Sequence, residues 1–462
     1  MASENLQTNP IKENKMGVMP VNRLLITMSL PMMISMLVQA LYNVVDSIFV
    51  AMIEEKALTA VSLAFPVQNV MIAVAMGTCV GMNALVSKAL GEKKYEFGNK
   101  VAVTTIFLQI CGFIVFFIFG RFFSRAFYAA QTSDEVIIRY GVQYVQTICM
   151  CSIGVYMQST FERMLQSTGK TIYTMITQGT GAIINIIMDP ILIFGYFGFP
   201  EMGVRGAAVA TVFGQCVAAV LAITINFKVN HEVHLSFKGF RPEGRIIKSI
   251  YKIGIPSIIM QAISGVMNFG MNQILLGFSS TATTVFGIYY KLQSFVFMPV
   301  FGLNNGTVPI VAYNYGAGKR SRVIKAIKLS CIYAVAIMLI GFALMQLIPG
   351  KLLLLFSASD NMLEIGIPAL RIISISFIAA GYCIGMGSVF QALGCATYSM
   401  INSVCRQVVV LLPVAWLFSK TGNLSLVWWS FPIAEVSSVI LNTIFFIKVY
   451  RTLIVHIGEN QS

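Results

Sequence analysis

The chain has few charged residues and few of the residues that usually carry out enzyme chemistry. Asp, Glu, Lys and Arg make up only 11% of its 462 residues, against roughly 25% in a soluble domain. Its three histidines lie in polar segments outside any H-E-x-x-H motif, and no G-x-S-x-G turn occurs. A Gly-Lys-Thr triplet at 169–171 lacks the first glycine of a nucleotide-binding loop. We therefore expect no enzyme, no ATP site and no cofactor.

Paired cysteines and a cleavable signal are also missing. None of the nine cysteines has C-x-x-C spacing, and all lie in or beside apolar runs, so they predict neither a metal site nor a disulfide framework. Residues 1–20 are polar and lack the apolar core of a signal peptide. The first apolar run should therefore remain in place as a membrane span.

Apolar sequence is what the chain has in abundance: 57% of its residues are apolar, and the mean hydropathy is +0.78. About 20 residues are needed for a helix to cross a bilayer, and the backbone inside lipid must pair within the helix. No run shows the alternation of a barrel strand. The composition thus predicts an all-α integral membrane protein of about twelve transmembrane helices. The runs lie at roughly 23–50, 58–88, 100–127, 136–162, 172–196, 204–227, 250–277, 283–313, 323–348, 362–390, 397–418 and 425–449.

The net charge of +14 lies mainly in alternate connections between these runs. Lys and Arg cluster at 88–100, 228–252 and 319–328, whereas the intervening loops hold few. By the positive-inside rule, both termini and the central linker are cytoplasmic, which explains the charge without a nucleic-acid partner. We expect a multi-pass protein of the bacterial cell membrane. Its predicted parts are an N-terminal tail (1–22), a first lobe (23–227), a linker (228–249), a second lobe (250–450) and a C-terminal tail (451–462).

The two halves repeat each other at a constant offset of 225 residues. Each repeat holds an even number of spans, so both halves enter the membrane in the same direction and are related by an axis along the membrane normal. A cavity between two such lobes can open to either side by rocking, which favours a transporter over a channel. Gly-x-x-x-Gly motifs in both halves predict close helix packing. Matching pairs include Pro31 and Pro256, Asn43 and Asn268, Gly77 and Gly302, Gly81 and Gly306, and Gly91 and Gly316.

Two aspartates lie inside apolar runs, where an ionisable group costs about 2.5–3.5 kcal/mol. Asp46 is late in the first run and Asp189 late in the fifth. Tyr42 and Asn185 each precede one of them by four residues and share its helix face. Two carboxylates, an amide and a phenol could hold Na⁺ through oxygen or share a proton. The alternative is that each aspartate caps a helix end near the outer interface.

The repeat restricts this acidic pair to the first half, because Met271 and Val414 stand at the matching positions of the second. Pro190 has no N–H to bond the carbonyl of Ile186, so that oxygen is a further candidate ligand. We expect no metal beyond Na⁺.

Other charged residues inside the runs are secondary candidates. Glu162 and Arg163 could form a local pair at the cytoplasmic end of the fourth run. Lys291, Arg406 and Glu435 lie in the second half, where they could line the cavity or form a structural pair.

A substrate cavity between the lobes would be lined by amide, thioether and charged groups. Such groups accept many shapes without strict geometry. They would suit amphipathic organic cations, which the carboxylates attract when deprotonated. The candidates are Gln39, Asn43, Met267, Asn268, Met271, Gln273 and Lys291.

Several segments resemble the MATE (multidrug and toxic compound extrusion) exporters, and within them the MepA-type bacterial branch. These are 29–46, 88–100, 185–195 and 308–316, and the likeness extends over nearly the whole chain. The resemblance implies a twelve-helix, V-shaped antiporter that exports cationic, amphipathic compounds in exchange for H⁺ or Na⁺. We expect the protein to be a monomer.

The resemblance also implies functional residues. It assigns the cation site of the first lobe to Tyr42, Asp46, Asn185 and Asp189, with Thr211 in the sixth helix. The implied partners are small organic cations and membrane lipids. The alternative, from the wider superfamily, is a flippase for lipid-linked oligosaccharides, which would need basic cavity residues such as Lys291 and Arg406.

Overall fold

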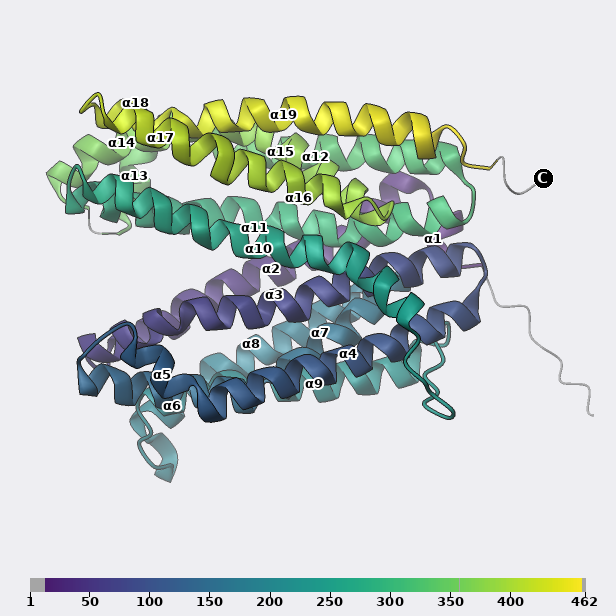
Figure 1. The fold of residues 1–462 in the computed structure, drawn as a ribbon, viewed down its shortest axis with the longest axis horizontal. Helices are drawn as coiled ribbons and strands as arrows, with labels where there is room; N and C mark the ends of the chain where they lie inside the picture. The colour runs from purple at the N-terminus through teal and green to yellow at the C-terminus, as the bar shows by residue number, and fades with distance from the viewer. Residues whose placement is uncertain (1–12, 357, 459–462) are drawn as a thin grey trace, which may run out of the picture.

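The computed structural model describes residues 13–356 and 358–458, and within them the chain is helical, without strands. Figure 1 shows two helical bundles side by side. The first holds α2 (Val21–Ala51), α3 (Glu55–Gly91), α4 (Tyr95–Phe122), α5 (Ser124–Ala129), α6 (Glu135–Met150), α7 (Ile153–Ser167), α8 (Thr171–Phe194), η1 (Tyr196–Gly198) and α9 (Val204–Val229). The short helix α1 (Lys15–Val18) precedes them and packs against α11 (Ser280–Gly316) of the second bundle.

The second bundle repeats this arrangement. It holds α10 (Gly244–Leu276), α11 (Ser280–Gly316), α12 (Arg320–Leu347), α13 (Pro349–Leu354), α14 (Asp360–Ser374), α15 (Ser376–Ala392), α16 (Ala396–Val404), η2 (Cys405–Leu411), α17 (Leu412–Ser419), α18 (Leu424–Trp428), α19 (Ser430–Val449) and η3 (Tyr450–Ile454).

Ten helices of the described chain are long and apolar enough to cross a membrane, and the bent pair α14 and α15, with 45° between them, makes eleven. The remaining predicted run, 136–162, forms α6 and α7, which break at Cys151 and Ser152. The break between α14 and α15 falls at Ile375, close to the matching position of the repeat. The predicted all-α membrane fold in two repeated lobes is therefore confirmed, and each lobe breaks its fourth run.

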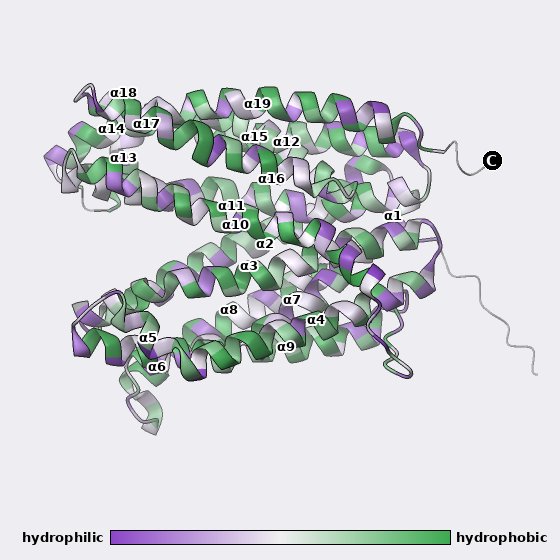
Figure 2. Ribbon diagram, in the orientation of Figure 1, coloured by the Kyte–Doolittle hydropathy of each residue, from purple (hydrophilic) through white to green (hydrophobic). Residues whose placement is uncertain are grey.

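Hydrophobic residues make up much of the length of the helices in both bundles, and hydrophilic residues gather mainly toward the helix ends and loops (Figure 2). Large side chains such as Val115, Phe269 and Ile340 are more than 60% exposed. A soluble protein rarely exposes apolar surface on this scale. These exposed apolar side chains are suited to contact lipid.

The lobes meet through α2 against α11 and through α3 against α10. At two places, residues related by the offset of 225 make reciprocal contacts across this interface. A Cβ on Gly91 would lie 2.0 Å from the carbonyl oxygen of Tyr313, and one on Gly316 would lie 2.2 Å from that of Lys88. Likewise, a Cβ on Gly77 would lie 2.4 Å from the side chain of Ile258, and one on Gly302 would lie 2.5 Å from the Cα of Met33, the matching residue. Close backbone approach explains these glycines, so the predicted close packing is confirmed.

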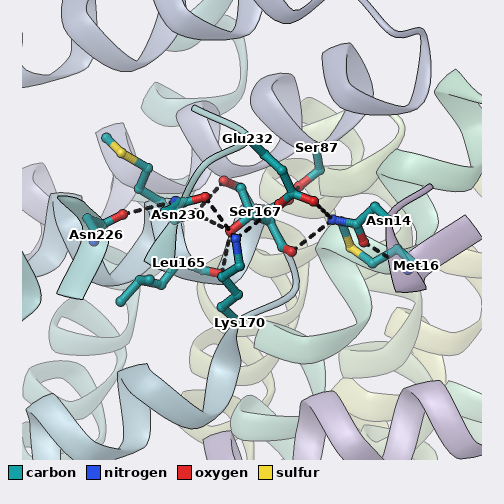
Figure 3. A network of polar contacts seen from close by, with 11 residues as sticks. Asn14, Met16, Ser87, Leu165, Ser167, Lys170, Asn226, Asn230 and Glu232 are labelled. Carbon is teal, nitrogen blue, oxygen red and sulfur yellow. Dashed lines mark hydrogen bonds and ion pairs between the residues drawn. The ribbon is translucent and has the colours of Figure 1, made fainter. Parts of the chain in front are cut away.

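Gly91 and Gly316 are the last residues of α3 and α11, so their contacts lie at the end of the molecule that carries α1, and the ribbons diverge toward the end with α5 and α13 (Figure 1). At this closed end, Asn14 donates to the Thr168 carbonyl (3.0 Å) and to Glu232 (2.6 Å). Lys170 lies 3.3 Å from both Glu232 and Asn230 (Figure 3). This closed-end network joins the chain before α1, the α7–α8 turn and the segment after α9.

The same short segment is bound by the second lobe. The carbonyl of Met16 accepts hydrogen bonds from Asn314 and Arg322, both at 2.9 Å, and Lys319 lies 2.6 Å from Glu13. Part of the predicted N-terminal tail is thus packed between both lobes. Residues 1–12 and 459–462 of the predicted tails lie outside the described residues.

Candidate functional site

The two candidate aspartates come together between α2 and α8, which pack against each other. The two carboxyl groups lie close enough to interact with each other, and the phenol of Tyr42 interacts electrostatically with both. Asp189 is fully buried. Both residues lie inside helices, five residues before the last residue of each, and three of their oxygens accept no hydrogen bond from the described chain. The capping alternative is therefore wrong.

Asn185 links this pair to α9. Its amide nitrogen donates to the Thr211 hydroxyl at 3.3 Å, and that hydroxyl donates to the Ala207 carbonyl at 3.0 Å. The structure thus brings Thr211 beside Asn185. Helix α8 runs without a break through Pro190, so the aspartate and the amide keep their shared face.

Although the two carboxyl groups lie close enough to share a proton, four buried oxygens of this cluster accept no hydrogen bond from an N–H or hydroxyl group of the described residues: Asp46 Oδ1, Asn185 Oδ1, and both carboxyl oxygens of Asp189. Burying a polar group without a partner costs about 1–3 kcal/mol, and an unpaired carboxylate costs more. Four such atoms in one place are therefore unfavourable unless a cation or protons neutralise them. Oxygen donors are the ligands that Na⁺ prefers. The donor set thus fits Na⁺ or protons.

A cavity of about 90 Å³ continues from this cluster through the interior of the first lobe. Asn185 and Thr211 line one part of it and Glu162 lines another, whereas the two aspartates are not among its lining residues. Its polar lining comes from Ser35, Gln39, Tyr42, Gln158, Ser159, Glu162, Gln178, Asn185, Thr211 and Gln215.

Glu162 is 2% exposed and accepts three side-chain hydrogen bonds. The donors are Gln158 at 3.0 Å, Thr177 at 2.8 Å and Gln178 at 2.7 Å. Gln178 also contacts the Ser35 hydroxyl, which ties α8 to α2. Glutamines and a threonine therefore hold this carboxyl group at the cavity wall.

Glu162 does not pair with Arg163, so a local ion pair was the wrong alternative. Arg163 instead donates to Gln166 at 3.0 Å and to Asn305 at 2.9 Å. Because Asn305 belongs to α11, this contact joins the two lobes.

Sequence reasoning missed the glutamines. Gln158 precedes Glu162 by one helical turn, and Gln178 follows Thr174 by the same spacing. Such i, i+4 polar pairs within apolar runs were a signal that could have found this polar face. Their convergence on one carboxyl group depends on how α7 packs against α8, which spacing alone does not give.

The residues predicted to line a cavity between the lobes separate into groups. Gln39 lines the cavity within the first lobe. Asn43 and Gln273 are exposed and Asn268 is half-buried. Lys291 is also exposed, with its ammonium 5.9 Å from the centre of the Phe356 ring.

The two methionines depart from the prediction. Met271 is 0% exposed and Met267 is 9% exposed, and both pack in the apolar core. A fully enclosed side chain cannot line an open cavity, so this expectation is wrong for Met271. Its helical spacing with Met267 reflects core packing.

Arg406 and Glu435, both secondary candidates, form an ion pair between η2 and α19, with Nη1 and Oε2 3.0 Å apart. The alternative of a structural pair is the one that the structure supports. Arg406 is therefore not an unpaired basic group, which a lipid-pyrophosphate site would require.

Comparison with known proteins adds a family. Residues 31–191 and 256–417 both match the sequence model of the MatE family, one match in each repeat. The chain is 27% identical over 420 residues to the multidrug export protein MepA of Staphylococcus aureus (strain bovine RF122 / ET3-1), covering 90% of this chain and 91% of that protein. It is also 27% identical to MepA of Staphylococcus haemolyticus (strain JCSC1435), covering 88% and 89%. Its fold is similar to an outward-facing multidrug resistance MATE family transporter of the MOP superfamily, with TM-score 0.90, 23% identity, and 96% and 98% of the two chains covered.

Proposed function

The chain belongs to the MATE family, and from that premise we propose that it is a cation-coupled exporter of amphipathic, mostly cationic drugs and toxic organic compounds. The coupling cation is H⁺ or Na⁺, and the lobes give access to each side of the membrane in turn. The protein works as a monomer in the bacterial cell membrane, with both termini in the cytoplasm.

The observation that carries the proposal is the cluster of four unpartnered, buried oxygens on Asp46, Asn185 and Asp189. Two carboxylates attract an organic cation while they are deprotonated and free of Na⁺. Binding of H⁺ or Na⁺ neutralises them and weakens that attraction. Because one site cannot stabilise both kinds of cation equally, the entry of one favours the release of the other.

The direction of export follows from the charged end of the molecule. The lobes meet at the end where Lys and Arg cluster, and the positive-inside rule assigns that end to the cytoplasm. The molecule is then closed inward, and its lobes diverge outward. A conformation of this kind would release the drug outside and take up the coupling cation from there.

The test uses purified protein in liposomes with an ethidium-like cation and imposed gradients of pH or Na⁺, applied separately. We expect one of the gradients to drive accumulation, and Asp189→Asn to abolish it. Asp134→Asn is the control for loss of a carboxylate outside the spans: Asp134 caps α6, where Asn caps equally well, and its ion pair with Lys56 is at the surface, where such pairs contribute about 0–1 kcal/mol. Transport by Asp189→Asn at the control rate would contradict the proposal. Transport of a lipid-linked oligosaccharide in place of the cation would favour a flippase.

A further inference from the structure

The second lobe holds an ion pair deep within its spans. Arg406 Nη1 lies 3.0 Å from Glu435 Oε2. Glu435 is 4% exposed, and its other oxygen, Oε1, has no hydrogen-bond partner among the described residues. Tyr289 on α11 and Cys383 on α15 also lie close to this pair, and neither carries a positive charge. Arg406 is thus the counter-charge of Glu435.

The repeat relates this pair to the cation site of the first lobe. At the offset of 225 residues, Arg406 corresponds to Gly181 and Glu435 to Ala210. Gly181 lines the first-lobe cavity one turn from Asn185, and Ala210 directly precedes Thr211. In the repeat, the ion pair therefore occupies positions of the second lobe within one helical turn of those that match Asn185 and Thr211 in the first lobe.

The three-dimensional structure keeps this correspondence. In the first lobe, Thr174 donates to the carbonyl of Glu162 at 3.2 Å. In the second lobe, Ser399 donates to the carbonyl of Gly387, the matching residue, at 3.0 Å. The packing of α15 against α16 therefore matches that of α7 against α8 at this contact.

The local backbone differs where the pair lies. In the first lobe, α8 and α9 approach so closely that a Cβ on Gly181 would lie 3.1 Å from the carbonyl oxygen of Gly214. In the second lobe, Arg406 belongs to η2, a π-helical turn, and such turns are frequent at functional sites. The second lobe thus accommodates a long cationic side chain where the first has only a glycine.

We propose that Arg406 is a tethered counter-cation that takes, in the second lobe, the place of the exchangeable cation in the first, and so confines exchangeable cation binding to the first lobe. This inference rests on the proposed function, because it takes Asp46 and Asp189 as the exchangeable site. A guanidinium stays protonated in proteins and is covalently attached, so it cannot be released with the transport cycle. A neutral side chain at 406 would leave a buried carboxylate, which must then take up H⁺ or Na⁺.

The test counts cations bound to purified protein in nanodiscs, with ²²Na⁺ for sodium and a pH indicator for protons. In the background Asp46→Asn/Asp189→Asn/Glu162→Gln, which removes the three carboxyl groups described in the first-lobe interior, we expect no exchangeable cation. Adding Arg406→Gln should raise the count by about one per chain, because Glu435 loses its counter-charge. Adding Glu435→Gln as well should return the count to that of the background. A folded Arg406→Gln protein with no added cation would overturn the inference.

Two further variants keep the test decisive if Arg406→Gln does not fold. The neutral pair Arg406→Gln/Glu435→Gln, in the otherwise native chain, should bind as many cations as the native protein. A lower count would mean that Glu435 itself exchanges a cation, and would overturn the inference. The charge-swapped pair Arg406→Glu/Glu435→Arg should likewise leave the count unchanged. If the background still binds a cation, the proposed first-lobe site fails, whereas the increment caused by Arg406→Gln still tests Arg406.

Discussion

Replacing Gly91 by alanine should weaken the closed end of the transporter. The new Cβ would lie 2.0 Å from the carbonyl oxygen of Tyr313 and 2.9 Å from the amide nitrogen of Ala317, whereas ordinary contact begins at 3.4 Å. The lobes must therefore separate by roughly 1.4 Å at this point. Overpacking of this kind costs about 1–3 kcal/mol, and that cost falls on the closed conformation. The ratio of closed to open molecules should then fall by about 5-fold to 150-fold.

Distances between spin labels across the closed end measure this change. Suitable positions are the exposed residues Glu96 in the first lobe and Ser321 in the second, in a chain freed of native cysteines. Gly98→Ala is the matched control, since its Cβ would meet only Ala89, at an ordinary 3.6 Å. Gly316→Ala should act like Gly91→Ala, because it makes the reciprocal contact. Distance distributions for Gly91→Ala that match those of Gly98→Ala would refute the reasoning.

Three further expectations concern single contacts. Thr177→Val removes one hydrogen bond from Glu162 and should lower the unfolding free energy by about 0.5–1.5 kcal/mol, measured by thermal denaturation in detergent, whereas Thr177→Ser should be close to native. Lys170→Met removes one ion pair of the closed-end network, so the rate of cysteine labelling at that end should increase, by less than about fivefold. Lys170→Arg is the control. No increase would mean that this ion pair does not hold the end closed. The hydrogen bond and charge of Lys319 lower the pKa of Glu13 below its usual value of 4.5. This contact therefore stabilises the fold fully above pH 4.5 and is lost as the pH falls through the lowered pKa. A spin label on α1 should become mobile only in acid, and a mobility that does not depend on pH would contradict the role of this contact.

Much of the fold could be predicted because the apolar runs are long and bounded by charges. The predicted run 23–50 became Val21–Ala51, and 397–418 became the helical stretch from Ala396 to Ser419. The breaks within the fourth and tenth runs could not be predicted, because neither has a proline or glycine at the break itself. The packing of Lys15–Val18 between the lobes was also missed, since it depends on tertiary contacts with both lobes.

Some residues of the candidate site could be predicted from the sequence, and others could not. Asp46 and Asp189 stood out because charge inside an apolar run is costly wherever the helices pack. Gln158 and Gln178 did not, because a neutral amide in a span carries a weaker signal and its partner lies on another helix. Met271 was misassigned because helical spacing does not tell a core face from a cavity face.

The measurement that tests the central claim most directly is the competition between an ethidium-like cation and the coupling ion for purified protein. The affinity for the organic cation should fall as the pH is lowered or Na⁺ is added. Thermodynamic reciprocity requires the organic cation to weaken H⁺ or Na⁺ binding by the same factor. Both effects should disappear together in Asp46→Asn/Asp189→Asn. Saturable drug binding that neither H⁺ nor Na⁺ changes, or a competition that survives in the double variant, would contradict a coupling site on Asp46 and Asp189.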